Sequence, residues 1–362
     1  MYNKSKLVNV RAGGCNMNDV EFNKGSGLTR WSYILICHPG PQNPCEPKDP
    51  TEVIKAFTQK LKKLGITTSE ASQGRKLVLS RPDDPMLEAV IRGTAAKFDF
   101  LLVILPSATS PVYHRVKSLG DLTYGIHTVC IVASKMAKLQ GQDQYFSNVA
   151  LKFTLKLGGH NQLVEPSRLG IINEDKTMVV GIDVTHPSPG SSKAAPSIAG
   201  MVASIDKHVF QFPGVITVQS EARQEMISAL TGMLKSRLRL WKELGKHNSF
   251  PESLLIYRDG VSEGQYQTVI GNELPILRAA CTELYTLADQ KKGLPRMTII
   301  IVSKRHHTRF YPSTTQDADR FSNNPAGTVV DRGLLCWTRY SGASMRTASR
   351  CLIETSRMWW SC

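Results

Sequence analysis

Short apolar runs alternate with segments of helical periodicity along most of the chain. The runs at 31–37, 98–106, 125–133, 178–184, 253–259 and 297–303 have the length and composition of buried strands. Between them, apolar residues recur at helical spacing over 50–64, 85–96, 142–157, about 223–245 and about 263–288. Strands that alternate with helices in this way predict an α/β fold.

The same pattern predicts how the chain divides. A helix ends at Gly158-Gly159, so we expect one domain over 31–159 and a second over 160–333, with residues 1–30 as a linker-like segment. In the second domain, two runs on either side of Asp206 and Lys207 predict a hairpin. Residues 334–362 show no clear period of 2 or 3.6, so we treat them as a divergent tail and expect the sheet to end at 297–303.

Composition narrows the class of protein. Of the 362 residues, 41% are hydrophobic and 21% are charged, which is typical of a globular protein rather than a disordered chain. No apolar run approaches the roughly 18 residues of a membrane span. The cysteines are scattered, without the spacing of a zinc site, which favours reduced thiols inside the cell. We therefore expect a protein without a membrane segment, located in the cytoplasm or, as an alternative, also in the nucleus.

The charge balance points to the kind of partner. The formal net charge is +15. A polyanion is the leading expectation, because lysine and arginine that neutralise phosphates release condensed counterions. Charge alone would also fit an acidic membrane surface.

Carboxylates follow two of the predicted strands. Asp183 ends the run VVGIDV and Asp259 ends LLIYRD, while Glu225 lies in the first turn of the long predicted helix. Carboxylates at strand ends and a helix start could converge on Mg²⁺ or Mn²⁺, which prefer oxygen ligands and can support phosphodiester hydrolysis. The alternative is structural, since such aspartates are often turn or cap residues and Glu225 also complements its helix N-terminus.

Basic residues share helix faces. Tyr113 and Lys117 stand four residues apart on a short helix that begins after Ser110, and Lys152 and Lys156 repeat this spacing on the helix 142–157. Ammonium groups beside an aromatic ring suit a terminal phosphate whose base stacks on the ring. A solvated helix face is the competing interpretation.

A basic run follows the last predicted strand. Residues 303–309 read SKRHHTR, and such a density of positive charge outside a helix suits contacts with a nucleic-acid backbone. The candidate contacts are Lys304, Arg305, His306 and Arg309.

Seven ordered segments resemble one known family. PVYHRVKSLGD, QDQYFSNVALKFTLKLGGHNQ, GIDVTHPSPG, SEARQE, YRDGVSEGQ, KRHHTRFYP and NPAGTVVD are similar to the MID and PIWI domains of a eukaryotic Argonaute, from about residue 31 to 332. The resemblance implies a Rossmann-like MID domain that holds the 5′ end of a small guide RNA. It also implies an RNase H-like PIWI domain that can cut the paired target RNA.

The resemblance assigns roles in the MID domain. Tyr113 would stack on the first guide base and Lys117 would bind its 5′-phosphate, while Lys152 and Lys156 would complete the pocket. Where many relatives carry a glutamine after YG, this chain reads HTV at 127–129. That contact is expected to fall to Thr128 or to be absent.

In the PIWI domain the resemblance is incomplete. Asp183, Glu225 and Asp259 match three of the family's four catalytic positions, and they would hold Mg²⁺ or Mn²⁺ weakly. The fourth residue, an aspartate or histidine, has no match after GTVVD, and the N-terminal and PAZ domains of the family have no counterpart. We therefore expect a PIWI domain that lacks its C-terminal part, with weak or absent guided cleavage.

Three functions follow from these expectations. The first is an Argonaute-type protein of RNA-mediated silencing that binds a guide RNA and, through it, a complementary target. The second is a non-catalytic guide-binding fragment or truncated product. The third is an RNase H-like nuclease that acts without a guide. The sequence identifies no protein partner.

Overall fold

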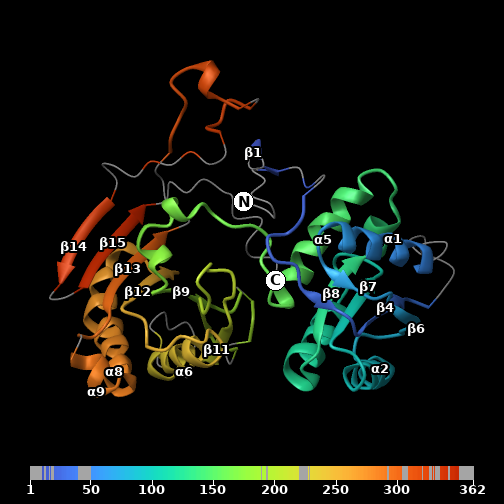
Figure 1. Ribbon diagram of the computed structural model, residues 1–362, viewed down its shortest axis with the longest axis horizontal. Helices are drawn as coiled ribbons and strands as arrows, with labels where there is room; N and C mark the ends of the chain where they lie inside the picture. The colour runs from blue at the N-terminus through green and yellow to red at the C-terminus, as the bar shows by residue number, and fades with distance from the viewer. Residues whose placement is uncertain are drawn as a thin grey trace. The chain divides into compact units, whose positions relative to one another are not determined.

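The computed structural model describes two compact units. Described residues are 10–11, 14–15, 17, 20–39, 50–188, 190–192, 195–219, 227, 229–291, 293–303, 309–319, 321–325, 328, 330, 335–340 and 343–349. The main part of unit 1 is Gly14–Leu163 and that of unit 2 is Val164–Ser361 (Figure 1). Near the N-terminus, β1 (Val10–Arg11) and β2 (Gly14–Cys15) form a two-stranded sheet.

Unit 1 is built on a four-stranded parallel sheet. Its strands lie in the order β6 (Ser72–Val78), β4 (Trp31–Cys37), β7 (Phe100–Leu105) and β8 (His127–Val132). The helices are α1 (Pro50–Lys63), α2 (Pro85–Ala95), α3 (Val112–Lys117), the π-helical turn η2 (Ser118–Tyr124), α4 (Ala133–Ala137) and α5 (Gln142–Lys156). The strands β4 and β7 are buried along their whole length, as their continuous apolar sequences predict.

Each face of this sheet has its own core. Helices α1 and α5 cover one face, where Phe153 of α5 stacks on Phe100 with ring centroids 4.3 Å apart. Helices α2 and α3 cover the other, through Leu87 and Val116 among others. The sheet thus has helices on both sides, as predicted for α/β units.

Residue 17 and residues 20–28 belong to unit 1 and do not behave as a linker. Met17, Val20, Phe22 and Leu28 are buried in the core beneath α1 and α5. The main chain also joins the fold, since the Phe22 amide donates to the Leu64 carbonyl at 2.8 Å and β3 (Gly27–Leu28) pairs with β5 (Thr67–Thr68). The sequence did not reveal this because the four apolar residues follow no regular period.

Unit 2 is built on a seven-stranded mixed sheet. The order is β11 (Gly214–Val218), β10 (Ile198–Ala203), β9 (Thr177–Thr185), β12 (Ser253–Asp259), β13 (Arg296–Ser303), β15 (Ala343–Ser349) and β14 (Leu335–Tyr340). Strands β9, β12, β13 and β15 run parallel, and β10, β11 and β14 are antiparallel to their neighbours. The predicted hairpin is the β10–β11 pair.

The helices of unit 2 pack on this sheet through one core. That core joins α6 (Leu230–Glu243) and α8 (Leu274–Leu284) to the buried side chains of β9, β10, β12 and β13. The predicted helix 263–288 is interrupted: η5 (Glu263–Gln265), α7 (Tyr266–Thr268) and the π-helical turn η6 (Val269–Glu273) precede α8, and α9 (Leu287–Lys291) follows it. Short 3-10 turns complete the unit: η3 (Pro166–Arg168), η4 (Gly170–Glu174) and η7 (Thr315–Asp317).

The sheet continues beyond β13, contrary to the sequence prediction. β15 pairs in parallel with β13 from Met297↔Ala343 to Ser303↔Ser349, and β14 pairs antiparallel with β15. The sequence pattern did not predict β14 and β15, because Arg339 and Arg346 interrupt the alternation of apolar residues. The strands can still pair, because pairing uses main-chain groups. In the part of the chain that the structure describes, every helix is too short or too polar to cross a lipid bilayer.

Candidate functional site

The lysines predicted in unit 1 gather around strand β8. Lys117 is the last residue of α3, and its Nζ donates to the Thr128 carbonyl at 2.8 Å and to Thr128 Oγ1 at 2.9 Å. Gly120 allows η2 to approach β8 this closely, because a Cβ at this position would lie 2.7 Å from Thr128 Cγ2. The structure thereby fixes Lys117 at one edge of the sheet.

Electrostatic effects on pKa values place Lys156 near Lys117, and Lys152 within reach of Cys130 on β8. Burial lowers the pKa of Lys117, and the neighbouring charge of Lys156 lowers this pKa further. Burial raises the pKa of the Cys130 thiol to about 11, although Lys117, Lys156 and Lys152 all act to lower it. The three ammonium groups and the acidic group of Asp121 therefore all lie near enough to Cys130 of β8 to influence its ionisation. Crowded ammonium groups of this kind favour a bound anion.

Two further residues of β8 lie beside the lysine cluster. Thr128 is fully buried and its hydroxyl accepts from Lys117, so its side chain positions the lysine instead of facing a ligand. His127 begins β8 and remains open to solvent, and partial desolvation of its ring together with the charge of Lys156 lowers the pKa of His127. The sequence marked His127 only as a departure from relatives; its position beside the lysines makes it part of the site.

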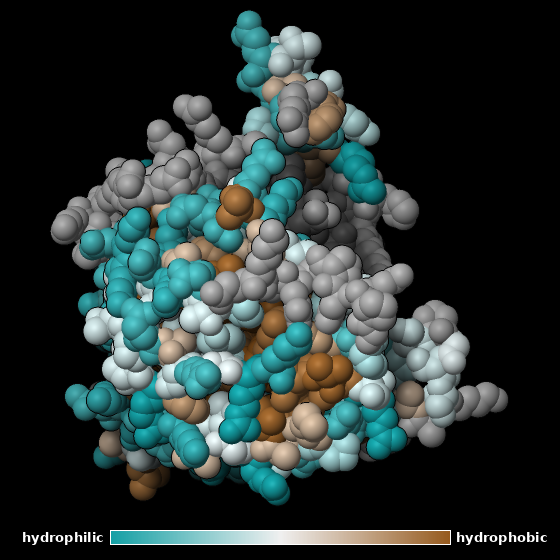
Figure 2. Space-filling view, turned by 90° about the vertical axis from the view of Figure 1, so that its right-hand side faces the viewer, coloured by the Kyte–Doolittle hydropathy of each residue, from teal (hydrophilic) through white to brown (hydrophobic). Residues whose placement is uncertain are grey.

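Tyr113 completes the arrangement in unit 1. It lies half-buried on α3, one turn before Lys117, with its ring edge-on to His114 at a centroid distance of 5.5 Å. Figure 2 shows a face of the molecule on which hydrophilic side chains lie around a central hydrophobic patch. A base stacked on Tyr113 would have its 5′-phosphate one helical turn away, near Lys117.

Two of the three carboxylates predicted to bind a metal ion, Asp183 and Asp259, are described and lie on adjacent parallel strands. β9 and β12 pair in register up to Ile182↔Arg258, so Asp183 and Asp259 follow at the same edge of the sheet. Each carboxylate accepts a main-chain N–H at 2.8 Å: Asp183 Oδ1 from Val184, and Asp259 Oδ1 from Gly260. The Oδ1 atom of each carboxylate is thereby oriented by the main chain of the following residue.

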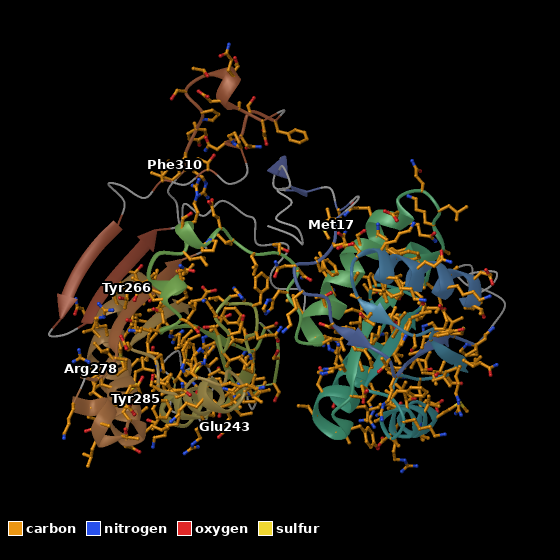
Figure 3. All side chains as sticks on the ribbon, viewed as in Figure 1. Met17, Glu243, Tyr266, Arg278, Tyr285 and Phe310 are labelled. Carbon is orange, nitrogen blue, oxygen red and sulfur yellow. The ribbon has the colours of Figure 1, made fainter. Side chains whose placement is uncertain are left out.

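Other predicted residues lie outside the described part of the chain. Glu225, Lys304, Arg305 and His306 are not among the described residues. Arg309 is described and exposed, and it begins a loop that stands away from the sheet of unit 2, where Figure 3 labels Phe310. Among the described residues, no group of three or more His, Cys, Asp or Glu could hold a metal ion.

The sequence analysis missed a buried ion pair behind Asp259. The side chains of Arg258 and Glu273 are 1% and 3% exposed, and the guanidinium Nε and Nη2 each donate to one carboxylate oxygen at 3.0 Å. A signal was present in the sequence, since Arg258 directly follows the apolar run LLIY and Glu273 directly precedes LPIL. Charges in such stretches are rarely buried unless paired.

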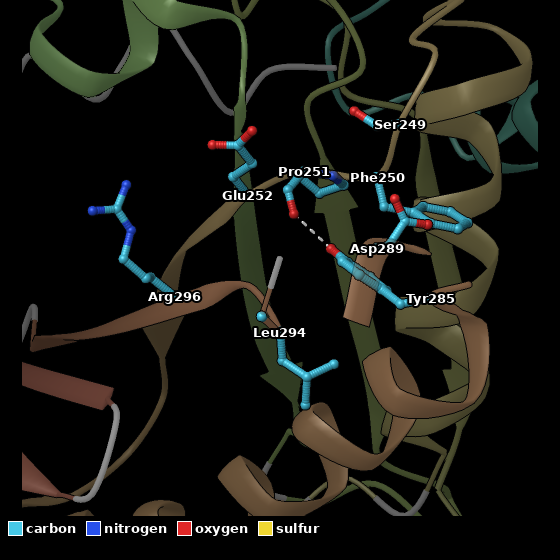
Figure 4. Close-up of a pocket in the computed structure, with 9 residues that line it drawn as sticks. Ser249, Phe250, Pro251, Glu252, Tyr285, Asp289, Leu294 and Arg296 are labelled. Carbon is cyan, nitrogen blue, oxygen red and sulfur yellow. Dashed lines mark hydrogen bonds between the residues drawn. The ribbon is translucent and has the colours of Figure 1, made fainter. Parts of the chain in front are cut away.

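A hollow in unit 2 lies elsewhere. Phe250, Pro251, Tyr285 and Leu294 line it, and the Tyr285 hydroxyl donates to the Pro251 carbonyl at 2.7 Å (Figure 4). Burial raises the pKa of Tyr285 above its usual range. This hollow adjoins the N-terminal end of β12, whereas Asp259 is the last residue of that strand. The hollow and the carboxylates therefore lie at opposite ends of the strands.

Comparisons with known proteins agree with the geometry. Residues 100–346 match the model of the Piwi domain. The MID-PIWI domains of Neurospora crassa QDE-2 AGO are 35% identical with a TM-score of 0.67, over 78% of this chain and 76% of that chain. The C-terminal lobe of a budding yeast Argonaute is 24% identical with a TM-score of 0.72, over 89% and 67%. Kluyveromyces polysporus Argonaute, solved with a guide RNA, is 22% identical with a TM-score of 0.72, over 90% of this chain and 40% of that chain.

Proposed function

The chain belongs to the Argonaute family of Piwi-domain proteins, and from this premise we propose that it binds the 5′-phosphorylated end of a small single-stranded guide RNA. The observation that carries the proposal is the lysine cluster at β8. Lys117 is held by Thr128, and Lys156 lies close enough to lower its pKa. A 5′-phosphate would relieve this repulsion, because it brings negative charge and strong acceptor oxygens.

Each residue has a defined part in this binding. Lys117 and Lys156 would donate to the phosphate, with Lys152 adding positive charge from one turn earlier on α5. Tyr113 would stack on the first base. Sequence-independent contacts of this kind fit a protein that must accept many guides, and base pairing of the guide would then select the target RNA.

A comparison of 5′-phosphate with 5′-hydroxyl RNA tests the proposal. A charged hydrogen bond contributes about 1.5–3 kcal/mol, so the phosphorylated strand should bind at least about tenfold more tightly at fixed salt. The double variant Lys152→Ala, Lys156→Ala should lose this preference. Equal affinities of the unmodified protein for the two strands would refute the proposal.

A matched control separates the pocket from general charge. Lys138 is an exposed lysine of the same unit. Lys138→Ala should weaken binding of both strands slightly, since it removes one positive charge, and should leave their ratio unchanged. A preference that survives in the double variant would show that the phosphate binds elsewhere.

A second candidate function is metal-dependent cleavage of the paired target RNA. The observation that favours it is that Asp183 and Asp259 lie side by side at the C-terminal ends of the adjacent strands β9 and β12. Their carboxylate oxygens are ligands suited to Mg²⁺ or Mn²⁺. A bound divalent cation would supply charge stabilisation at the scissile phosphate. The protein's part is to hold the two carboxylates in a fixed orientation, as their main-chain hydrogen bonds do.

A further inference from the structure

The buried pair Arg258–Glu273 lies directly beneath the proposed metal site. Arg258 immediately precedes Asp259 on β12, and Glu273 is the last residue of the π-helical turn η6, just before α8. The two parallel hydrogen bonds of 3.0 Å fix the plane of the guanidinium. The guanidinium therefore has one orientation relative to the end of β12.

Stability alone does not explain why two charges are buried here. Removing both ions from water is costly, and apolar residues of similar size often stabilise a fold equally well. A third contact gives the pair a further role: Arg258 Nη1 donates to the carbonyl of Asp259. The guanidinium thus connects η6 to the main chain of the residue whose carboxylate faces the site.

The turn after Asp259 is packed between charged groups. Gly260 has φ +77°, which favours glycine, and a Cβ at this position would lie 3.4 Å from Asp183 Oδ1 and 4.0 Å from Arg258 Nη1. The Gly260 amide also donates to Asp259 Oδ1. A shift of Arg258 would therefore move the turn and the Asp259 carboxylate, and so change where Asp259 lies relative to Asp183.

We propose that Arg258, held by Glu273, is a positioning residue that sets how Asp259 and Asp183 face a divalent cation. The proposal rests on the metal site of the second candidate function. The substitution Arg258→Lys tests it, because lysine keeps the charge but cannot form two parallel bonds to Glu273 and also reach the Asp259 carbonyl. A second variant, Arg258→Met with Glu273→Leu, removes both charges together.

Calorimetric titration with MnCl₂ is the first measurement. The unmodified full chain should bind Mn²⁺, and Asp183→Ala should abolish binding. Arg258→Lys and the double apolar variant should bind Mn²⁺ at least about tenfold more weakly, as for other residues that orient metal ligands. The thermal midpoint of each variant, measured in parallel, identifies any that fail to fold.

The pair Lys235–Glu283 provides the matched control. It joins α6 to α8 with the same combination of charges, far along the helix from η6. Lys235→Met with Glu283→Leu should leave the Mn²⁺ affinity unchanged. Parental affinity in a folded Arg258 variant would overturn the positioning role and leave the metal site intact, whereas absence of Mn²⁺ binding by the unmodified protein would overturn the metal site itself.

Amide hydrogen exchange supplies a readout that needs no metal. In Arg258→Lys, exchange should accelerate in a peptide covering 258–262 while the rest of β12 keeps its protection. Unchanged exchange in this turn would contradict the proposal even if Mn²⁺ affinity fell. If the double variant does not fold, Arg258→Lys alone decides the outcome by both measurements.

Discussion

Lys117 shows how one residue couples folding to binding. Burial and the charge of Lys156 lower the pKa of Lys117 from 10.5, so the folded protein holds this proton less tightly than the unfolded chain does. Between the lowered pKa and 10.5, the unfolded chain binds more protons, and stability therefore rises with pH. Phosphate binding has the opposite dependence, because it requires the charged lysine.

The first prediction is that the preference for a 5′-phosphate weakens as pH rises through the lowered pKa of Lys117. The loss should begin below pH 10.5, where an ordinary lysine would still be charged. The affinity ratio of phosphorylated to hydroxylated 2′-O-methyl strands, which resist alkaline hydrolysis, measures it. In Lys117→Arg, which stays charged, the ratio should persist to higher pH. A ratio that is constant up to pH 10.5 in the unmodified protein would contradict this interpretation.

At the scale of elements, the sequence predicted the strands whose side chains are buried and missed a strand whose side chains are mostly exposed. The strands β4, β7, β9, β12 and β13 are apolar runs that the sequence identifies directly. β6, with the sequence SQGRKLV, was missed because an edge strand obtains its pairing from the main chain while its side chains face water. The carboxylates were found at strand ends, but the Arg258–Glu273 pair requires knowledge that η6 packs behind β12.

The second prediction concerns the two strands that follow β13. β15 has partners on both sides, whereas β14 is the edge of the sheet. Amide hydrogens of 343–349 should therefore exchange more slowly than those of 335–340, because an edge strand leaves part of its N–H groups unpaired. Hydrogen exchange with mass spectrometry measures both peptides in one experiment. Equally fast exchange in both would show that the sheet ends at β13.

At the scale of the whole molecule, the two units have separate cores. The core of unit 1 includes residues before position 31, where the sequence pattern placed the start of the domain. Phe22 and Leu28 are 1% and 2% exposed in the core shared with α1 and α5. Burying such a side chain contributes about 1.5–3 kcal/mol, against a total stability of about 5–15 kcal/mol for a domain. A fragment that begins at residue 31 therefore loses a large part of its stability.

The third prediction is that residues 14–163 fold alone and that residues 31–159 do so poorly. The longer fragment should unfold cooperatively on heating, and the shorter one should unfold at least about 10 °C lower, since each kcal/mol shifts the midpoint of a domain this size by several degrees. Circular dichroism measures both. Within the longer fragment, Phe22→Ala should lower the midpoint, whereas Met86→Ala, at a side chain that is 53% exposed, should not. Equal midpoints for the two fragments would mean that the residues before position 31 contribute no measurable stability to unit 1.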